Sequence, residues 1–373
     1  MTDICEFSPA YVRAIAPYQP GKPISELARE YGLNERDIVK LASNENPLGM
    51  SPLARDALEK EIAELARYPD GNAFDLKAAI ARRYAVPPEC IVVGNGSNDL
   101  LEMVGSAFLA PGRAAVMSQH AFAVYPLATQ ARGARLITVR ARDYGHDLQA
   151  MAAAITPETR VVFIANPNNP TGTFAPEAAV ADFLKRVPPE VVVILDEAYN
   201  EYLPRELRYD SVKWLGRHPN LVIVRTFSKI YGLAGLRVGF GLMSAGIADL
   251  LNRVRQPFNV NNLALAAAAA ALLDNAFVHK SYELNRKGMQ DLEQAFRRLD
   301  LEWIASCANF VSVRIPHRGG KPAAGAVYEQ LLRRAVIVRS LAGYEMPDHL
   351  RVTVGLPEEN ERFVHALEQA LAA

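Results

Sequence analysis

Cysteine is scarce in this sequence, with three among 373 residues, Cys5, Cys90 and Cys307. An odd number without metal-like spacing favours free thiols in a reducing compartment, which we expect to be the cytoplasm. The seven histidines are scattered singly, with no pair at helical spacing. Zinc or iron chemistry is therefore not expected, and we predict no metal site.

Excess charge and long apolar runs are also missing. The 41 basic and 41 acidic residues cancel, so no basic surface for nucleic acid or an anionic membrane is expected. The longest apolar stretch, 263–273, is mostly alanine, is shorter than the roughly 20 residues of a membrane span, and is predicted to be a buried helix. The first residues lack the pattern of a secretory signal. What remains is a globular protein long enough for two domains.

The most informative stretch that is present covers 226–240 and reads TFSKIYGLAGLRVGF. Lys229 lies beside Thr226 and Ser228 and upstream of Arg237, in a glycine-rich turn that follows an apolar run. A lysine amine can condense with an aldehyde, and two hydroxyls with an arginine can hold a phosphate, which together suggest pyridoxal phosphate. Taken alone, the stretch would also suit a surface lysine in a loop, so the lysine needs partners elsewhere.

Two apolar runs, 160–165 and 191–195, are predicted to be buried strands. The segment 176–187 between them has helical spacing and begins with proline, which favours a helix. Such a β-α-β unit has a right-handed crossover, so the two strands are expected to be parallel neighbours.

Polar residues follow these strands at the edge where ligands gather in an open parallel sheet. Asn169 follows the first strand, Asp196 and Tyr199 follow the second, and Lys229 follows the run 221–224. A buried carboxylate such as Asp196 would keep a pyridine nitrogen protonated, although an Asp after a strand is more often a helix cap or a turn former. Tyr199 and Asn169 could donate hydrogen bonds to the phenolate oxygen of the ring.

A series of short motifs extends along nearly the whole chain, in the order LASNENP (41–47), RYPDG (67–71), GNGSND (94–99), NPNNPTG (166–172), DEAY (196–199), SK (228–229) with GLRVG (235–239), and LRVTVG (350–355). In these motifs the sequence resembles the fold type I, class II aminotransferases, specifically their histidinol-phosphate aminotransferase branch. The resemblance implies an α/β, three-layer pyridoxal-phosphate-dependent transferase fold like that of aspartate aminotransferase, with a mostly parallel central sheet and a smaller α/β domain. We expect residues 1–45 to form an arm and part of the small domain, 46–262 the large cofactor-binding domain, and 263–373 the small C-terminal domain.

The resemblance also implies roles for the cofactor-binding residues. Lys229 would be the Schiff-base lysine and then the base that moves a proton between substrate and cofactor. Cofactor phosphate would be held by a set of side chains and of backbone amides at a helix start, namely Thr226, Ser228, Arg237, Gly96, Ser97 and Asn98. GNGSND also resembles the start of a dinucleotide fingerprint, but the third glycine is absent. Phe122 matches the residue that stacks on the pyridine ring, with Tyr125 as the alternative.

Substrate recognition is implied in the same way. Arg351 would bind the carboxylate of glutamate as a bidentate pair, unless it is a surface charge on an edge strand. Arg339 would contact the substrate phosphate, Asn169 lies beside the substrate, and Tyr18 belongs to an N-terminal arm that closes over it. Tyr68 would reach the cofactor phosphate of a neighbouring subunit, which makes the protein a homodimer.

The resemblance implies transamination between L-histidinol phosphate and 2-oxoglutarate, giving imidazole acetol phosphate and glutamate, in two half-reactions of histidine biosynthesis. Three alternatives remain at this point. An aromatic amino acid aminotransferase or a phospho-amino-alcohol decarboxylase would keep the cofactor and change the substrate, and a non-catalytic descendant would keep only the fold.

Overall fold

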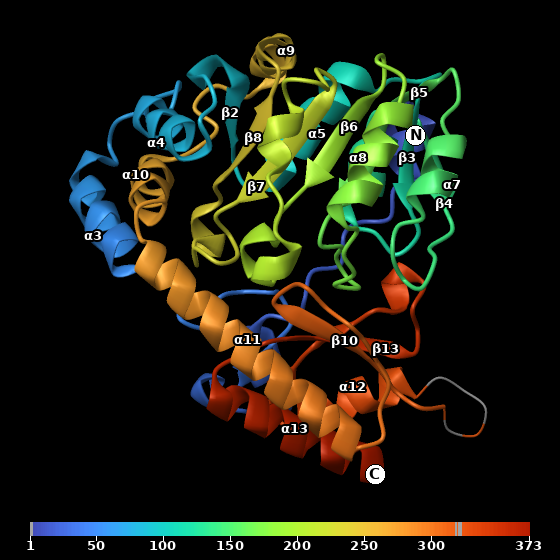
Figure 1. The fold of residues 1–373 in the computed structure, drawn as a ribbon. Helices are drawn as coiled ribbons and strands as arrows, with labels where there is room; N and C mark the ends of the chain where they lie inside the picture. The colour runs from blue at the N-terminus through green and yellow to red at the C-terminus, as the bar shows by residue number, and fades with distance from the viewer. Residues whose placement is uncertain (1–2, 318, 320–322) are drawn as a thin grey trace.

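A seven-stranded sheet forms the upper body of the computed structural model, which describes residues 3–317, 319 and 323–373 (Figure 1). Its strand order is β2-β8-β7-β6-β5-β3-β4, and only β8 is antiparallel to its neighbours. The sheet is therefore mostly parallel, as predicted. Its strands are β2 (Ile91–Gly94), β3 (Ala114–Ser118), β4 (Arg135–Val139), β5 (Thr159–Ala165), β6 (Val192–Asp196), β7 (Leu221–Thr226) and β8 (Gly239–Met243).

Helices cover both faces of this sheet and make three layers. Alternate residues of the central strands face opposite cores: Val161 and Phe163 pack with α5, α6 and α9, whereas Val162 and Ile164 pack with α4, α7, α8 and α10. Because both faces are buried, the strands are near-continuous apolar runs. These helices are α4 (Phe74–Tyr84), α5 (Ser97–Phe108), α6 (Val124–Gln130), α7 (Leu148–Ala153), α8 (Glu177–Arg186), α9 (Ala245–Val254) and α10 (Asn262–Ala271), with α3 (Pro52–Glu61) beside α10.

A second, smaller body lies below the large sheet (Figure 1). Its antiparallel sheet has the order β12-β13-β10-β9, and a two-stranded parallel ladder pairs β1 with β11. Phe296, Leu331 and Phe363 of its three helices meet β10 and β13 in a separate core. The elements are β1 (Val39–Lys40), β9 (Trp303–Ile304), β10 (Phe310–Arg314), β11 (Val336–Ile337), β12 (Arg339–Ser340), β13 (His349–Thr353), α11 (Asn275–Arg298), α12 (Ala324–Arg333) and α13 (Pro357–Ala372), with α2 (Ile24–Tyr31) packed against Ile337 of β11. The short helix α1 (Ala10–Arg13) lies beside the large body instead, where Tyr11 approaches Gly133 (Figure 1).

The β-α-β prediction is confirmed, because β5, α8 and β6 lie within two residues of the expected ranges and β5 pairs with β6 in parallel. The apolar stretch 263–273 forms α10, whose buried side chains are alanines. No single helix in the described chain is long and apolar enough to span a membrane, and α10 with α11 pass that test only as a pair bent by 80°. The division at 45/46 and 262/263 stays a prediction.

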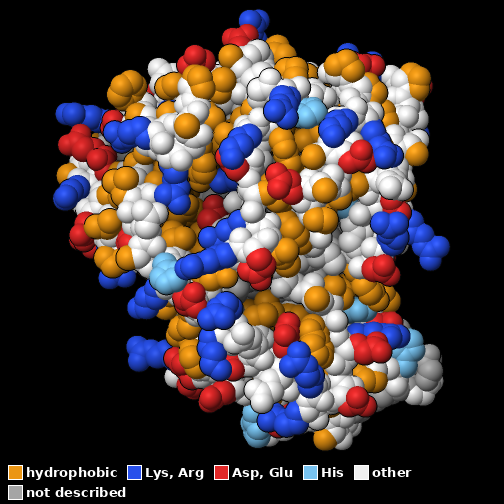
Figure 2. Space-filling view, in the orientation of Figure 1, with side chains coloured by type: hydrophobic (Ala, Val, Ile, Leu, Met, Phe, Trp, Pro, Cys, Tyr) orange, Lys and Arg blue, Asp and Glu red, His pale blue; other side chains and the backbone are white. Residues whose placement is uncertain are grey.

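Figure 2 shows basic and acidic side chains interspersed over the face drawn, in keeping with the balanced charge of the sequence. Between the two bodies passes the segment that follows β1. Leu41 N–H donates to Ile337 O at 2.7 Å, and Thr353 N–H donates to Leu41 O at 2.9 Å. These contacts fix the chain at 41–45, which bends at Ala42 and Ser43, beside the carboxyl ends of the large sheet.

Candidate active site

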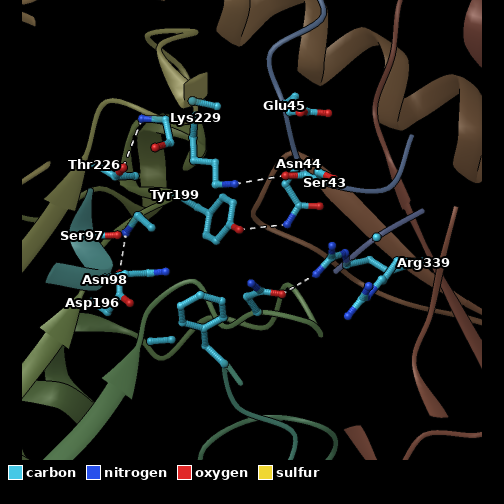
Figure 3. A pocket seen from close by; sticks show the side chains of 18 of the residues that line it. Ser43, Asn44, Glu45, Ser97, Asn98, Asp196, Tyr199, Thr226, Lys229 and Arg339 are labelled. Carbon is cyan, nitrogen blue, oxygen red and sulfur yellow. Dashed lines mark hydrogen bonds between the residues drawn. The ribbon is translucent and has the colours of Figure 1, made fainter. Parts of the chain in front are cut away.

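A cleft of about 380 Å³ opens where β5, β6 and β7 end, and side chains of the smaller body close its other side (Figure 3). Its walls include the following residues that the sequence predicts for the site: Tyr18, Ser97, Asn98, Phe122, Asn169, Asp196, Tyr199, Thr226, Ser228, Lys229, Arg237, Arg339 and Arg351. The topological argument thus brings together side chains that lie far apart in the sequence.

Lys229 follows β7 and projects its amine into the cleft, where Nζ donates to Ser43 O at 3.2 Å (Figure 3). Burial, followed by the positive charge of Arg351, lowers the pKa of Lys229 to about 8. A larger fraction of the amine is then neutral near pH 7 than for a surface lysine. A neutral amine can act as a nucleophile or take up a proton.

Asp196 is the last residue of β6 and is only 5% exposed. Burial raises its pKa to about 6, while the Tyr125 hydroxyl at 2.9 Å and the Ala198 N–H at 3.2 Å donate to the carboxylate and oppose that rise. A cation in the cleft would favour the ionised form further. Asp196 is therefore a carboxylate with structural support, and it does not cap a helix.

Phe122 and Tyr125, the two candidates for stacking on the pyridine ring, have different contacts. The Tyr125 ring stacks on Phe163 with centroids 4.7 Å apart, and its hydroxyl donates to Asp196 at 2.9 Å. Phe122 meets Tyr125 edge-on at 5.7 Å, and both residues line the cleft. Tyr125 thus supports the Asp196 carboxylate, and stacking by Phe122 stays a prediction.

One end of the cleft suits an anion. Gly96, with φ +79°, precedes the first turn of α5, whose free N–H groups point out of the helix. A Cβ on Gly96 would lie 2.6 Å from Arg237 Nη2, and a Cβ on Gly239 would lie 2.6 Å from Ser97 N. Both glycines permit a close approach of backbone and guanidinium that larger residues would prevent. Gly96 is not itself in the cleft wall, but it lies directly against Arg237.

Two arginines of the smaller body face the opposite end. Arg351 is 5% exposed, and its guanidinium donates to Asn169 Oδ1 at 2.6 Å and to Ala42 O at 2.7 Å. Because β13 pairs with strands on both sides, Arg351 is not on an edge strand. Arg339 donates to Gln19 O at 2.7 Å, and its guanidinium lies 5.9 Å from the ring centroid of Tyr18.

Tyr68 lies apart from the cleft of its own chain. It is 81% exposed and stacks on Phe258 with centroids 4.7 Å apart.

Asn44 and Tyr344 also line the cleft, although the sequence predicts no role for either. Asn44 belongs to the quoted motif LASNENP and adopts φ +56°, a conformation that asparagine tolerates better than most residues. The motif LASNENP is therefore the feature of the sequence from which a role for Asn44 could have been predicted.

Comparison with known proteins identifies relatives along the full chain. A family model described as aminotransferase class I and II matches residues 36–367. Histidinol-phosphate aminotransferase 2 of Nitrosospira multiformis is 59% identical over 99% of this chain and 93% of its own length, and histidinol-phosphate aminotransferase of Methylobacillus flagellatus is 58% identical over 100% and 99%. The crystal structure of histidinol-phosphate aminotransferase from Sinorhizobium meliloti in complex with pyridoxal-5'-phosphate superposes with a TM-score of 0.90 at 28% identity, covering 100% of this chain and 99% of that one.

Proposed function

The chain belongs to the class I and II aminotransferases, and we propose that it transfers an amino group between L-histidinol phosphate and 2-oxoglutarate in histidine biosynthesis. Relatives at 58% and 59% identity over nearly the whole length carry that activity in their names. The observation that carries the proposal is the convergence of Lys229, Asp196 and Arg351 on one cleft.

Pyridoxal phosphate fits the residues present. The α5 start with Arg237, Thr226 and Ser228 would hold its phosphate, in a cradle that a Cβ on Gly96 would fill. When bound, the cofactor supplies an aldehyde that accepts the amino group and a ring that withdraws electrons from the reacting carbon. Asp196 would hold the proton of the ring nitrogen.

Side chains of the protein would then move the substrate proton and donate hydrogen bonds to the cofactor ring. Lys229 Nζ takes the proton from the substrate carbon that bears the amino group, for which a pKa near 8 suits an amine working close to neutral pH. Tyr199 and Asn169 line the cleft and would donate hydrogen bonds to the ring oxygen of the cofactor, and Phe122 would stack on its ring. Two half-reactions in ping-pong order follow, because the amino group is stored between them.

Arg351 and Arg339 recognise the two acidic groups that distinguish the substrates, a carboxylate and a phosphate. Arg351 would bind the carboxylate of glutamate through its planar guanidinium, whose buried Nε–H has no hydrogen-bond partner among the described residues. Arg339, which Tyr18 and Gln19 hold at the mouth of the cleft, binds the phosphate of histidinol phosphate.

We further propose a cytoplasmic homodimer in which Tyr68 completes the phosphate site of the other subunit. Large apolar side chains around Tyr68 are exposed, with Ile62 and Leu65 at 53%, Phe74 at 73% and Phe258 at 46%. Such a patch favours burial against another protein. Sedimentation at micromolar concentration tests the dimer, and a monomer with full activity would contradict it.

Absorbance and kinetics together test the function. The purified protein with pyridoxal phosphate should show a visible band that changes when glutamate is added, and Lys229→Ala should abolish both the band change and turnover. The value of kcat/KM should be at least about tenfold higher for histidinol phosphate than for phenylalanine. Equal or better use of phenylalanine would favour the aromatic aminotransferase, and a protein that binds no cofactor would end the proposal.

A further inference from the structure

Asn44 contacts the hydroxyl of Tyr199 inside the cleft, and both residues are buried, at 1% and 4% exposure. Asn44 Nδ2 lies 2.8 Å from Tyr199 Oη, and Figure 3 shows the amide and the phenol pointing toward one another. The Asn44 main chain is also held, because its carbonyl accepts from Asn309 Nδ2 at 3.0 Å. Asn44 therefore meets Tyr199 from a fixed position.

The orientation of the Asn44 amide follows from Thr353. Thr353 Oγ1 accepts from Asn44 N–H at 2.9 Å and lies 3.2 Å from Asn44 Oδ1. The single hydroxyl proton of Thr353 is thus available only for Oδ1, which fixes Oδ1 as the acceptor and turns Nδ2 toward Tyr199. With the amide reversed, the Thr353 proton would face an NH₂ group and find no acceptor.

Tyr199 Oη must then accept a hydrogen bond from Asn44, and its own proton stays free for another partner. Burial, the leading cause, raises the pKa of Tyr199 to about 12, so the phenol keeps this proton at neutral pH. The titratable or charged groups near Tyr199 include Asp196, Lys229, Tyr344, Arg351, Tyr125 and Tyr202. Among the described residues none of these forms a hydrogen bond with the hydroxyl, whereas Asn44 does.

We propose that Asn44 is a positioning residue that directs the hydroxyl proton of Tyr199 into the cleft, toward the ring oxygen of pyridoxal phosphate. The inference rests on the proposed function, since it concerns how this chain receives that cofactor. It also links the two bodies of the protein, because Thr353 lies two residues from Arg351 and on the same face of β13. The strand that presents the substrate arginine thus also orients the tyrosine.

Two substitutions at Asn44 test the idea without straining its backbone, since aspartate and glycine both tolerate φ +56°. Asn44→Asp keeps the shape but can only accept from Tyr199, which draws the phenol proton away from the cleft. Asn44→Gly removes the contact altogether. We expect pyridoxal phosphate to bind cofactor-free variants roughly two- to tenfold more weakly than wild type, as for one lost hydrogen bond.

The second measurement is the pH at which the bound cofactor changes colour. A donor on the ring oxygen stabilises its deprotonated form, so weaker donation by the Tyr199 hydroxyl should raise this pH. We expect a rise of roughly 0.5 in Asn44→Gly, where the hydroxyl is no longer oriented, and a larger rise in Asn44→Asp, whose charge adds to the effect. In a Tyr199→Phe background, Asn44→Gly should produce no further change. The inference would be overturned if Asn44→Gly moved the pH of the colour change equally in both backgrounds. It would also be overturned if the substitution had no effect in the protein that keeps Tyr199.

Thr353 provides an independent route should the Asn44 variants fail to fold. Thr353→Val removes the hydroxyl that orients the amide and should move the colour change in the same direction as Asn44→Gly, whereas Thr353→Ser keeps the hydroxyl and should restore the wild-type value. Identical behaviour of the two variants would contradict the proposed role. Wild type that binds no pyridoxal phosphate would overturn the proposed function and this inference together, whereas normal binding with unchanged variants would overturn this inference alone.

Discussion

Replacing Glu197 by glutamine should destabilise the protein by about 3–5 kcal/mol. The carboxylate follows β6, and Arg225 of β7 donates to its Oε2 from Nη2 at 2.7 Å and from Nε at 2.9 Å. The two side chains are only 8% and 1% exposed. Glutamine would remove the carboxylate that pairs directly with this buried guanidinium, and the other carboxylate near it, Glu201, forms no hydrogen bond to it in the described chain.

A second ion pair of the same length is a matched control. Arg186 Nη2 lies 2.7 Å from Asp182 Oδ2 on α8, but these side chains are 50% and 51% exposed. Water screens such a pair, so Asp182→Asn should cost less than about 0.5 kcal/mol. The shortest distance between the charged atoms is the same in the two pairs, so the contrast reports burial together with the second hydrogen bond that Arg225 makes.

The assay is urea unfolding of the cofactor-free protein followed by circular dichroism, with the free energy of unfolding compared among wild type, Glu197→Gln and Asp182→Asn. Arg225→Met combined with Glu197→Leu should recover most of the loss, because both charges of the directly bonded pair are then absent. A loss below about 1 kcal/mol in Glu197→Gln would refute the reasoning. The same would hold if the double variant were less stable than either single one.

Three further predictions concern the cleft. Burial raises the pKa of Asp196 above its unfolded value to about 6, so the folded cofactor-free protein binds more protons and should lose roughly 2–3 kcal/mol of stability as pH rises from about 4 to about 6. Melting temperatures across this range should show that loss in wild type and not in Asp196→Asn. Gly96→Ala combines φ +79° with a Cβ 2.6 Å from Arg237 Nη2 and should weaken pyridoxal phosphate binding roughly tenfold, measured by fluorescence titration. Gly216→Ala, whose Cβ meets open space, should leave that affinity unchanged. Arg339→Gln should raise KM for histidinol phosphate roughly tenfold and leave KM for glutamate within about twofold in steady-state assays, and equal increases would contradict the sorting of substrates.

Much of the large sheet could be predicted because its strands have a strong local signal. The runs 160–165 and 191–195 are apolar at every position except Arg160, and the intervening helix begins after Pro176. Chain topology then requires parallel neighbours, so the edge that carries Asn169 and Asp196 followed without any tertiary information.

The contacts that orient the site could not be predicted in the same way. Asn44 and Thr353 are 309 residues apart, and nothing local to either indicates their hydrogen bonds. Tyr125 was an alternative for ring stacking because both candidate aromatics lie in one short segment. Only the fold shows that its hydroxyl reaches Asp196 and that its ring packs on Phe163.

Three consecutive residues after β1 each contact a different functional side chain. Ala42 O accepts from Arg351, Ser43 O accepts from Lys229, and the Asn44 amide donates to Tyr199. The chain bends at Ala42 and Ser43 and Asn44 adopts φ +56°, so two carbonyls and one side-chain amide of this short stretch face the arginine, the amine and the phenol. Its position depends on the register of β1 against β11, in which Val39 pairs with Val336 and Lys40 with Ile337. A shift of the β1–β11 register by one residue would break all three contacts at once. The position of the active-site groups therefore depends on this small parallel ladder.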